Sequence, residues 1–403
     1  MKKALAILAG LIAGIAALVI LVLFLLQQVF HDVPPPNDAD LRPKASAAPG
    51  ADSAYNDFVK ITAKLQLSPA ERELMVTQEK SKTPDLAAIG PLVARNADAL
   101  GLFSDFSRRT QFSDPNYLDP ARINFETPVP QFSPVVSAAR LSSLRGAALL
   151  RQGRAPKALE EALGIMDAGQ TLLRSDQPLI SALVGMLIGN IGASRAREVI
   201  NSGRLDKAWL LYAARRALAY RGGAAALQSG FRFEYISMTS MLAHLPEAAS
   251  NQPNSRLVSV GARSRYLYQP EQTRGLFAAR FRLLVEDAAK PCLQARQPGV
   301  QLQSIDLRPN MVGRILFNVA SPQYEKLYTR RCESDFQIAA AAVEAALAAY
   351  RLEHKRYPAG LDELVPRYLA FVPADPFTGA ALLYSPGTGE VHTAGKGVDG
   401  EAL

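Results

Sequence analysis

An uninterrupted apolar run near the N-terminus constrains this chain most. Residues 4–26 contain no charged side chain, and Lys2 and Lys3 stand immediately before them. These 23 residues would span about 34 Å as a helix, enough to cross a hydrocarbon core of about 30 Å. A cleavable signal peptide has a shorter apolar core with small residues close behind it, whereas two glutamines follow here, at 27–28. We therefore predict an uncleaved transmembrane signal anchor over residues 1–31, with cleavage as the alternative.

The residues that flank this run predict its orientation. Cytoplasmic flanks of membrane helices are enriched in Lys and Arg, which places Lys2 and Lys3 in the cytoplasm. The opposite flank begins with three aspartates, at positions 32, 38 and 40. We expect a single-pass protein of the bacterial inner membrane with its bulk in the periplasm. Residues 32–51, rich in Pro and Ala, are predicted to be an extended spacer between the membrane and the body.

Two cysteines, Cys292 and Cys332, lie in the part predicted to be outside the cytoplasm. In an oxidising compartment an even pair most simply forms a disulfide, and the alternative is two separate thiols. Two cysteines are too few ligands for a zinc site. We predict a structural disulfide that joins the segment after a helix at 277–290 to the start of a C-terminal domain.

Residues 52–290 predict an α-helical domain whose main array covers 135–245. Its apolar residues recur at helical spacing, and Ser68 with Glu71 forms a capping-box pattern. The expected helices are 55–65, 68–78, 156–173, 178–200, one from about 205 to 218, and 224–242. Stacked antiparallel hairpins and an irregular α-bundle both fit this pattern. Part of it, at 149–159, is similar to a tetratricopeptide hairpin, although the 34-residue consensus does not recur.

Charge is unevenly distributed along the chain. Residues 137–230 hold 13 Lys or Arg and 6 Asp or Glu, whereas residues 333–403 hold 5 and 10. The basic stretch predicts either a docking surface for an anionic partner, such as a protein or lipid headgroups, or internal pairing with the acidic stretch. The candidate docking residues are Arg140, Arg145, Arg151, Arg154, Arg195, Arg197, Arg215 and Arg216. The predicted compartment argues against nucleic acid as a partner.

After a connector at 291–332, residues 333–403 predict a small α+β domain. A helix from Ser334 to about His354 carries an apolar stripe, and two short strands flank a Pro-Gly-Thr-Gly turn at 386–389. The order Arg356-Tyr357-Pro358, then Pro-Ala-Asp-Pro-Phe at 373–377, then a Gly-rich loop at 394–400 resembles the periplasmic domain of G-type type II secretion pseudopilins. The resemblance covers about 70 residues of 403.

The resemblance implies a helix packed on a small antiparallel sheet and membership of a secretion or pilus-like assembly. The family's prepilin leader is absent, and the apolar segment is far from this domain in the sequence. The family's closing loop can hold calcium, and Asp399 matches one ligand position. One carboxylate is a poor site for a hard cation, so we expect no bound metal or cofactor.

Catalytic motifs are not found in the sequence. The four histidines, at 31, 244, 354 and 392, are scattered, and no Gly-Xaa-Ser-Xaa-Gly elbow occurs. Glu234, in a mostly apolar helix, is expected to pair with an arginine of a neighbouring helix. We therefore expect a mainly α, membrane-anchored, non-enzymatic scaffold that binds a protein partner in the envelope. The alternatives are an accessory component of a type II secretion or pilus-like system and an envelope enzyme.

Overall fold

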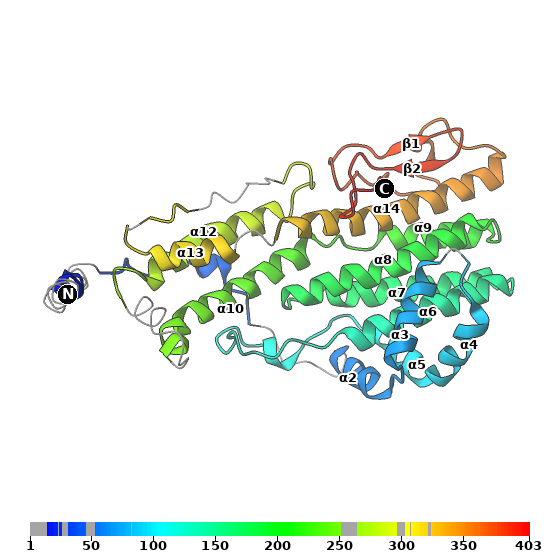
Figure 1. Cartoon of the computed structure of the whole chain (residues 1–403). Helices are drawn as coiled ribbons and strands as arrows, with labels where there is room; N and C mark the ends of the chain where they lie inside the picture. Colours follow the sequence, from blue (N-terminus) through cyan, green and yellow to red (C-terminus); the bar gives the residue numbers. More distant parts are fainter. Residues whose placement is uncertain are drawn as a thin grey trace, which may run out of the picture.

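The structure, a computed structural model, describes residues 14–22, 24–25, 31–45, 53–81, 83–250, 264–295, 303–306, 308–320 and 324–403. It is mainly helical, as predicted (Figure 1). The helical segments are η1 (Ala39–Leu41), α2 (Tyr55–Lys64), α3 (Pro69–Lys80), α4 (Leu86–Arg95), α5 (Ala97–Arg108), η2 (Pro115–Tyr117), α6 (Ser133–Arg151), α7 (Ala155–Leu173), α8 (Leu179–Asn201), α9 (Lys207–Leu218), α10 (Ala224–Ser250), α12 (Pro270–Asp287), α13 (Met311–Ala320), α14 (Glu325–His354) and η4 (Leu361–Leu364). The strands are β1 (Leu383–Ser385) and β2 (Glu390–His392).

Local signals located several helices well. Ser68 caps α3 and forms the predicted reciprocal capping box with Glu71. Gly203 ends the turn after α8 with a φ of 70°, a conformation that favours glycine. The largest boundary error concerns α14, which begins at Glu325 rather than near Ser334. Its added first turns pack on the helical body, and this tertiary contact has no local sequence signal.

Helices α7 and α8 form the centre of the molecule and pack unusually closely. A Cβ atom added at Gly169 would lie 2.7 Å from both the Gly185 carbonyl oxygen and the Gly189 amide nitrogen. One added at Gly192 would lie 2.6 Å from the backbone nitrogen of Met166. Glycine at these positions therefore allows the two backbones to touch, and 13 of the 19 residues of α7 are buried.

Helix α14 returns from far along the sequence to pack on α8 and α9 (Figure 1). Its apolar residues belong to the same buried cluster as those of α7–α12, and this cluster continues into Leu364, Phe377 and Val391 of the C-terminal segment. The predicted hairpin is present: β1 and β2 pair antiparallel with Tyr384 opposite Val391. The basic and acidic stretches therefore share one core.

A second buried cluster joins α2–α6 to the outer faces of α7 and α8. Phe58, Phe112 and Phe132 meet there with ring centroids 5.4–5.6 Å apart. This cluster places the short N-terminal helices along one side of the central pair, whereas α10, α12 and α14 lie on other sides (Figure 1).

The predicted membrane segment lies mostly outside the described residues. Residues 14–22 and 24–25 are helical, and their large apolar side chains, such as Ile20 at 66% and Phe24 at 57%, are exposed. Among the described residues, α8 alone is by itself long and apolar enough to cross a membrane, and the bent pair α4–α5 qualifies only if taken as one span. Because 72% of the apolar window of α8 is buried inside the protein, it serves as a core helix.

Candidate functional site

The most distinctive site is the place where residues 31–42 meet α10 and α12. The sequence predicted an extended spacer here, but the structure docks this segment on the body. Leu41 is only 1% exposed and joins the main buried cluster, and Asp38 is 6% exposed. The spacer prediction is therefore wrong for this segment, because its apolar and acidic side chains find partners that are some 200 residues away.

Three aspartates attach the segment to α12 at three places along the helix. Asp32 accepts hydrogen bonds from the backbone N–H groups of Glu271 and Gln272, at 2.7 and 3.0 Å. It thus caps the N-terminus of α12, where the helix dipole favours a negative charge. The other two aspartates pair with arginines two turns apart: Asp38 with Arg274, and Asp40 with Arg282 at 2.8 Å.

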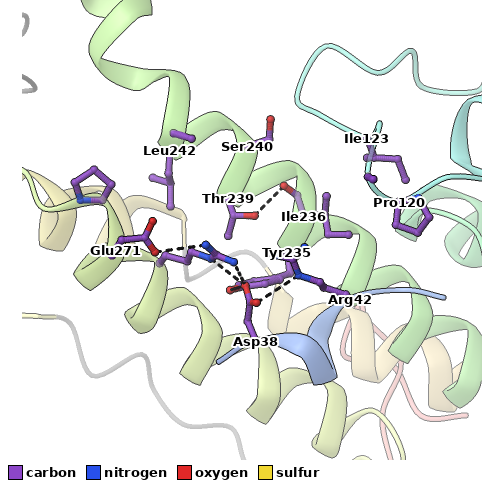
Figure 2. A pocket seen from close by; sticks show the side chains of 14 residues that line it. Asp38, Arg42, Pro120, Ile123, Tyr235, Ile236, Thr239, Ser240, Leu242 and Glu271 are labelled. Carbon is purple, nitrogen blue, oxygen red and sulfur yellow. Dashed lines mark hydrogen bonds and ion pairs between the residues drawn. The ribbon is translucent and has the colours of Figure 1, made fainter. Parts of the chain in front are cut away.

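Asp38 lies at the centre of a buried polar cluster (Figure 2). Its Oδ2 atom accepts hydrogen bonds from the Tyr235 hydroxyl at 2.7 Å and from Nε of Arg274 at 2.9 Å. Burial raises the pKa of Asp38, but the hydrogen bonds from Tyr235 and Arg274 outweigh this and hold it below its usual value. Burial and the bond to Asp38 raise the pKa of Tyr235. The carboxylate stays ionised and the phenol stays protonated at neutral pH.

A cavity of about 260 Å³ opens beside this cluster and is also lined by Arg42, Thr239 and Glu271 (Figure 2). Arg42 and Glu271 add ion-pair contacts at 3.4 Å, to Asp38 and to Arg274 respectively. The charges in the cavity therefore balance one another. The arrangement is suited to holding two segments together, since each ionised group already has a partner.

The eight arginines of the predicted docking surface differ in their partners and in their burial. Four make side-chain contacts inside the protein: Arg145 with Glu161, Arg195 with Ser143 and Glu198, Arg197 with Glu344 and Gln337, and Arg216 with Asp167 and Tyr212. Arg195 is 5% exposed, and Nε of Arg140 is buried without a hydrogen-bond partner in the described part of the chain. Arg151, Arg154 and Arg215 are exposed and make no ion pair with any described residue.

Internal pairing joins the basic stretch to the acidic one. Arg197 of α8 donates hydrogen bonds to the Glu344 carboxylate of α14 from Nε and from a terminal nitrogen, at 2.6–3.0 Å. Lys207 of α9 pairs with Glu353 near the end of α14. The hydrogen bonds from Lys207 and Tyr368 lower the pKa of Glu353 to about 2. Ion pairs between the basic and acidic stretches thus help to pack α14 on the body.

Glu234 has no ion pair with any residue that the structure describes. It is half-buried on α10, and burial raises its pKa. The arginine that we expected beside it on a neighbouring helix is therefore not found within the described ranges.

The cysteines are bonded, with a sulfur–sulfur distance of 1.99 Å. Cys292 lies in the turn after α12, and Cys332 lies in α14, where it is fully buried. The same turn reaches the C-terminal segment, since the Leu293 N–H donates to the Phe377 carbonyl at 2.8 Å. The disulfide thus joins α12, α14 and the C-terminal segment at one corner.

No family model, curated protein or solved structure matches this chain. Among the described residues, no group of three or more His, Cys, Asp or Glu side chains is placed to hold a metal ion. Sequence reasoning assigned the aspartates at 32, 38 and 40 to membrane topology and missed their contacts with α12, because the partners are distant and carry no motif.

Proposed function

We propose that this chain is a single-pass protein of the bacterial inner membrane whose helical body is a non-enzymatic scaffold for a protein partner in the periplasm. The observation that carries the proposal is the docking of residues 31–42 on α10 and α12. This segment follows the apolar run almost directly. In this proposal, the docked segment is the place where the body is attached to the membrane segment.

The chemistry of the docked site supports a structural role. The charges of its ionised groups, Asp38 and Arg274, neutralise each other, and the Tyr235 hydroxyl donates its hydrogen bond to Asp38. A catalytic pocket needs an ionisable group that is free to exchange a proton or attack a substrate. Here the same groups secure the membrane-proximal segment.

Membrane anchoring is tested by placing charge in the apolar run. Arginine at the centre of a membrane helix costs about 3 kcal/mol, so Leu18→Arg with Leu21→Arg should shift the chain from the alkali-resistant membrane fraction to the soluble fraction. Leu18→Ile with Leu21→Ile is the matched control and should stay in the membrane. Recovery of the unmodified chain in the soluble fraction would refute the anchor.

The scaffold role is tested by cross-linking in intact cells followed by purification from membranes. The expected result is a reproducible periplasmic or membrane protein partner that is retained by the unmodified chain. The Leu18→Arg with Leu21→Arg chain serves as the comparison, because loss of anchoring should reduce recovery of a partner at the membrane.

A second candidate is an accessory component of a type II secretion or pilus-like system. It is favoured by the order of α14, the β1–β2 hairpin and the closing loop. Asp375, in the Pro-Ala-Asp-Pro-Phe segment, accepts a hydrogen bond from the hydroxyl of Thr393, just before that loop, at 2.7 Å. Recovery of secretion-channel or pilus proteins in the same purification would favour this candidate, and their repeated absence would count against it.

A further inference from the structure

A basic end of the molecule lies opposite the docked N-terminal segment. The α6–α7 turn, the α8–α9 turn and the C-terminal end of α14 come together there, at the right of Figure 1, whereas α12 and α13 lie at the other end. Arg204 links the two turns by donating to the Leu150 carbonyl at 2.7 Å. We call this region the distal end; its exposed cations are Arg151, Arg154, Arg204, Arg351 and Lys355.

These five cations make no ion pair with a carboxylate in the part of the chain that the structure describes. Arg351 instead donates to the Tyr357 hydroxyl at 2.9 Å and lies over its ring. The C-terminus of α14 attracts cations in its last turn, which explains Arg351 and Lys355. It does not explain the three arginines at the interhelical turns, so the distal end carries exposed cations that no carboxylate among the described residues neutralises.

A cavity of about 480 Å³ opens beside two of these cations, Arg351 and Lys355. Its floor is apolar, formed by the buried side chains of Ile200, Leu205 and Leu210, and Leu352 is 43% exposed at the same site. Arg351 and Lys355 complete the lining, and none of the ten lining residues carries a carboxylate. An apolar floor beside cations without counter-charges is complementary to a ligand that combines an apolar side chain with flanking carboxylates.

We propose that the distal end binds an acidic segment of a protein partner, with an apolar side chain in this cavity and carboxylates on Arg351 and Lys355. Anionic lipid presents similar chemistry, but the proposed anchor would put the membrane near the docked segment, at the opposite end of the molecule. The choice of protein over lipid rests on the proposed anchoring, whereas the cavity and its charge do not depend on it.

The test uses the full chain in non-ionic detergent and a fluorescent peptide, Asp-Glu-Leu-Phe-Glu-Asp. Fluorescence anisotropy should show binding that weakens as salt is raised, because the contacts are between exposed charges. Peptides in which the acids are amides, or in which Leu-Phe is Ser-Ser, should bind at least tenfold more weakly. A photoreactive group at the Phe position should cross-link to α9 or α14.

Two pairs of charge reversals locate the site. Arg351→Glu with Lys355→Glu should weaken peptide binding at least tenfold, whereas the control pair Lys60→Glu with Arg122→Glu, which makes the same charge change elsewhere, should leave it within about twofold. Leu352→Ser, at an exposed position, should weaken binding about threefold by removing apolar contact.

The proposal is overturned if the peptide does not bind, if both charge-reversal pairs weaken binding equally, or if phosphatidylglycerol vesicles retain the detergent-free chain through Arg351 and Lys355 while the peptide does not bind. If the proposed anchor is wrong, the unmodified chain is recovered in the soluble fraction and still binds the peptide. The two proposals can therefore fail independently.

Discussion

Asp38 illustrates how one side chain can determine the position of a whole segment. It is buried, ionised and paired with Arg274, and Tyr235 donates to the same oxygen. Removing one member of a buried ion pair leaves the other charge without compensation, at a cost of about 3 kcal/mol. The contribution of Asp38 therefore depends on its charge as well as on its shape.

We expect Asp38→Ala to lower the free energy of unfolding by about 3 kcal/mol at neutral pH, measured by urea denaturation. Because the folded pKa of Asp38 lies below its ordinary value of 3.8, this contribution is present above pH 3.8 and disappears as the pH falls through the folded value. The control is Asp105→Ala, which removes one member of the surface ion pair with Arg108 and should change stability by less than about 0.5 kcal/mol. An equal loss in both variants would contradict the assignment.

Glu234 presents the opposite case, since burial raises its pKa without a compensating ion pair in the described ranges. An acid with a raised folded pKa destabilises the protein progressively as the pH rises from its unfolded pKa through the folded one. Glu234→Gln should therefore raise stability by about 1 kcal/mol at pH 7 and have little effect near pH 4. Thermal unfolding at both pH values measures this, and destabilisation at pH 7 would show that the carboxylate has a favourable partner.

At the level of elements, the α7–α8 contact depends on the absence of side chains at a few positions. The atoms nearest to a Cβ at Gly169 belong to the backbone of α8, which cannot move aside as a flexible side chain would. The close approach in turn places α14 and α10 around α8. The geometry of the distal cavity, between α8, α9 and α14, follows from this packing.

Gly169→Ala should destabilise the protein by about 3 kcal/mol, because the new methyl group overlaps two backbone atoms. Gly164→Ala on the same helix is a matched control, since its Cβ would meet only the Ser107 hydroxyl at 4.0 Å. That change should be neutral or stabilising by about 0.5 kcal/mol, as alanine favours a helix over glycine. Similar unfolding midpoints for the two variants would argue against the close contact.

At the scale of the whole molecule, the disulfide and the α14 ion pairs join regions that the sequence suggests are separate domains. Cys332 and Glu344 lie on one helix, and they connect it to the turn after α12 and to α8. Because these links cross the core, the body and the C-terminal segment are expected to unfold together.

Cys292→Ser with Cys332→Ser should lower the free energy of unfolding by about 2–4 kcal/mol, the usual effect of opening a loop of this size. Reduction of the unmodified chain should have the same effect, and reductant should not change the double variant. Separate unfolding transitions of α14 and the body in the oxidised protein would contradict the shared core.

Local sequence signals are sufficient to predict the apolar run, the mainly helical class, most helix positions, the hairpin and the cysteine pair. These features depend on local hydrophobic periodicity, capping residues and turn residues, which act over a few positions. Nothing in the described residues tests the membrane segment, which stays a prediction.

The docking of residues 31–42 on α12, the internal pairing of Arg197 and Arg216, and the position of five exposed cations at the distal end follow from the packing of the helices. Each depends on which side chains meet across 50 to 240 positions of sequence. An exposed arginine and a paired one look alike in a sequence, because the partner that neutralises the charge is chosen by the packing of the helices.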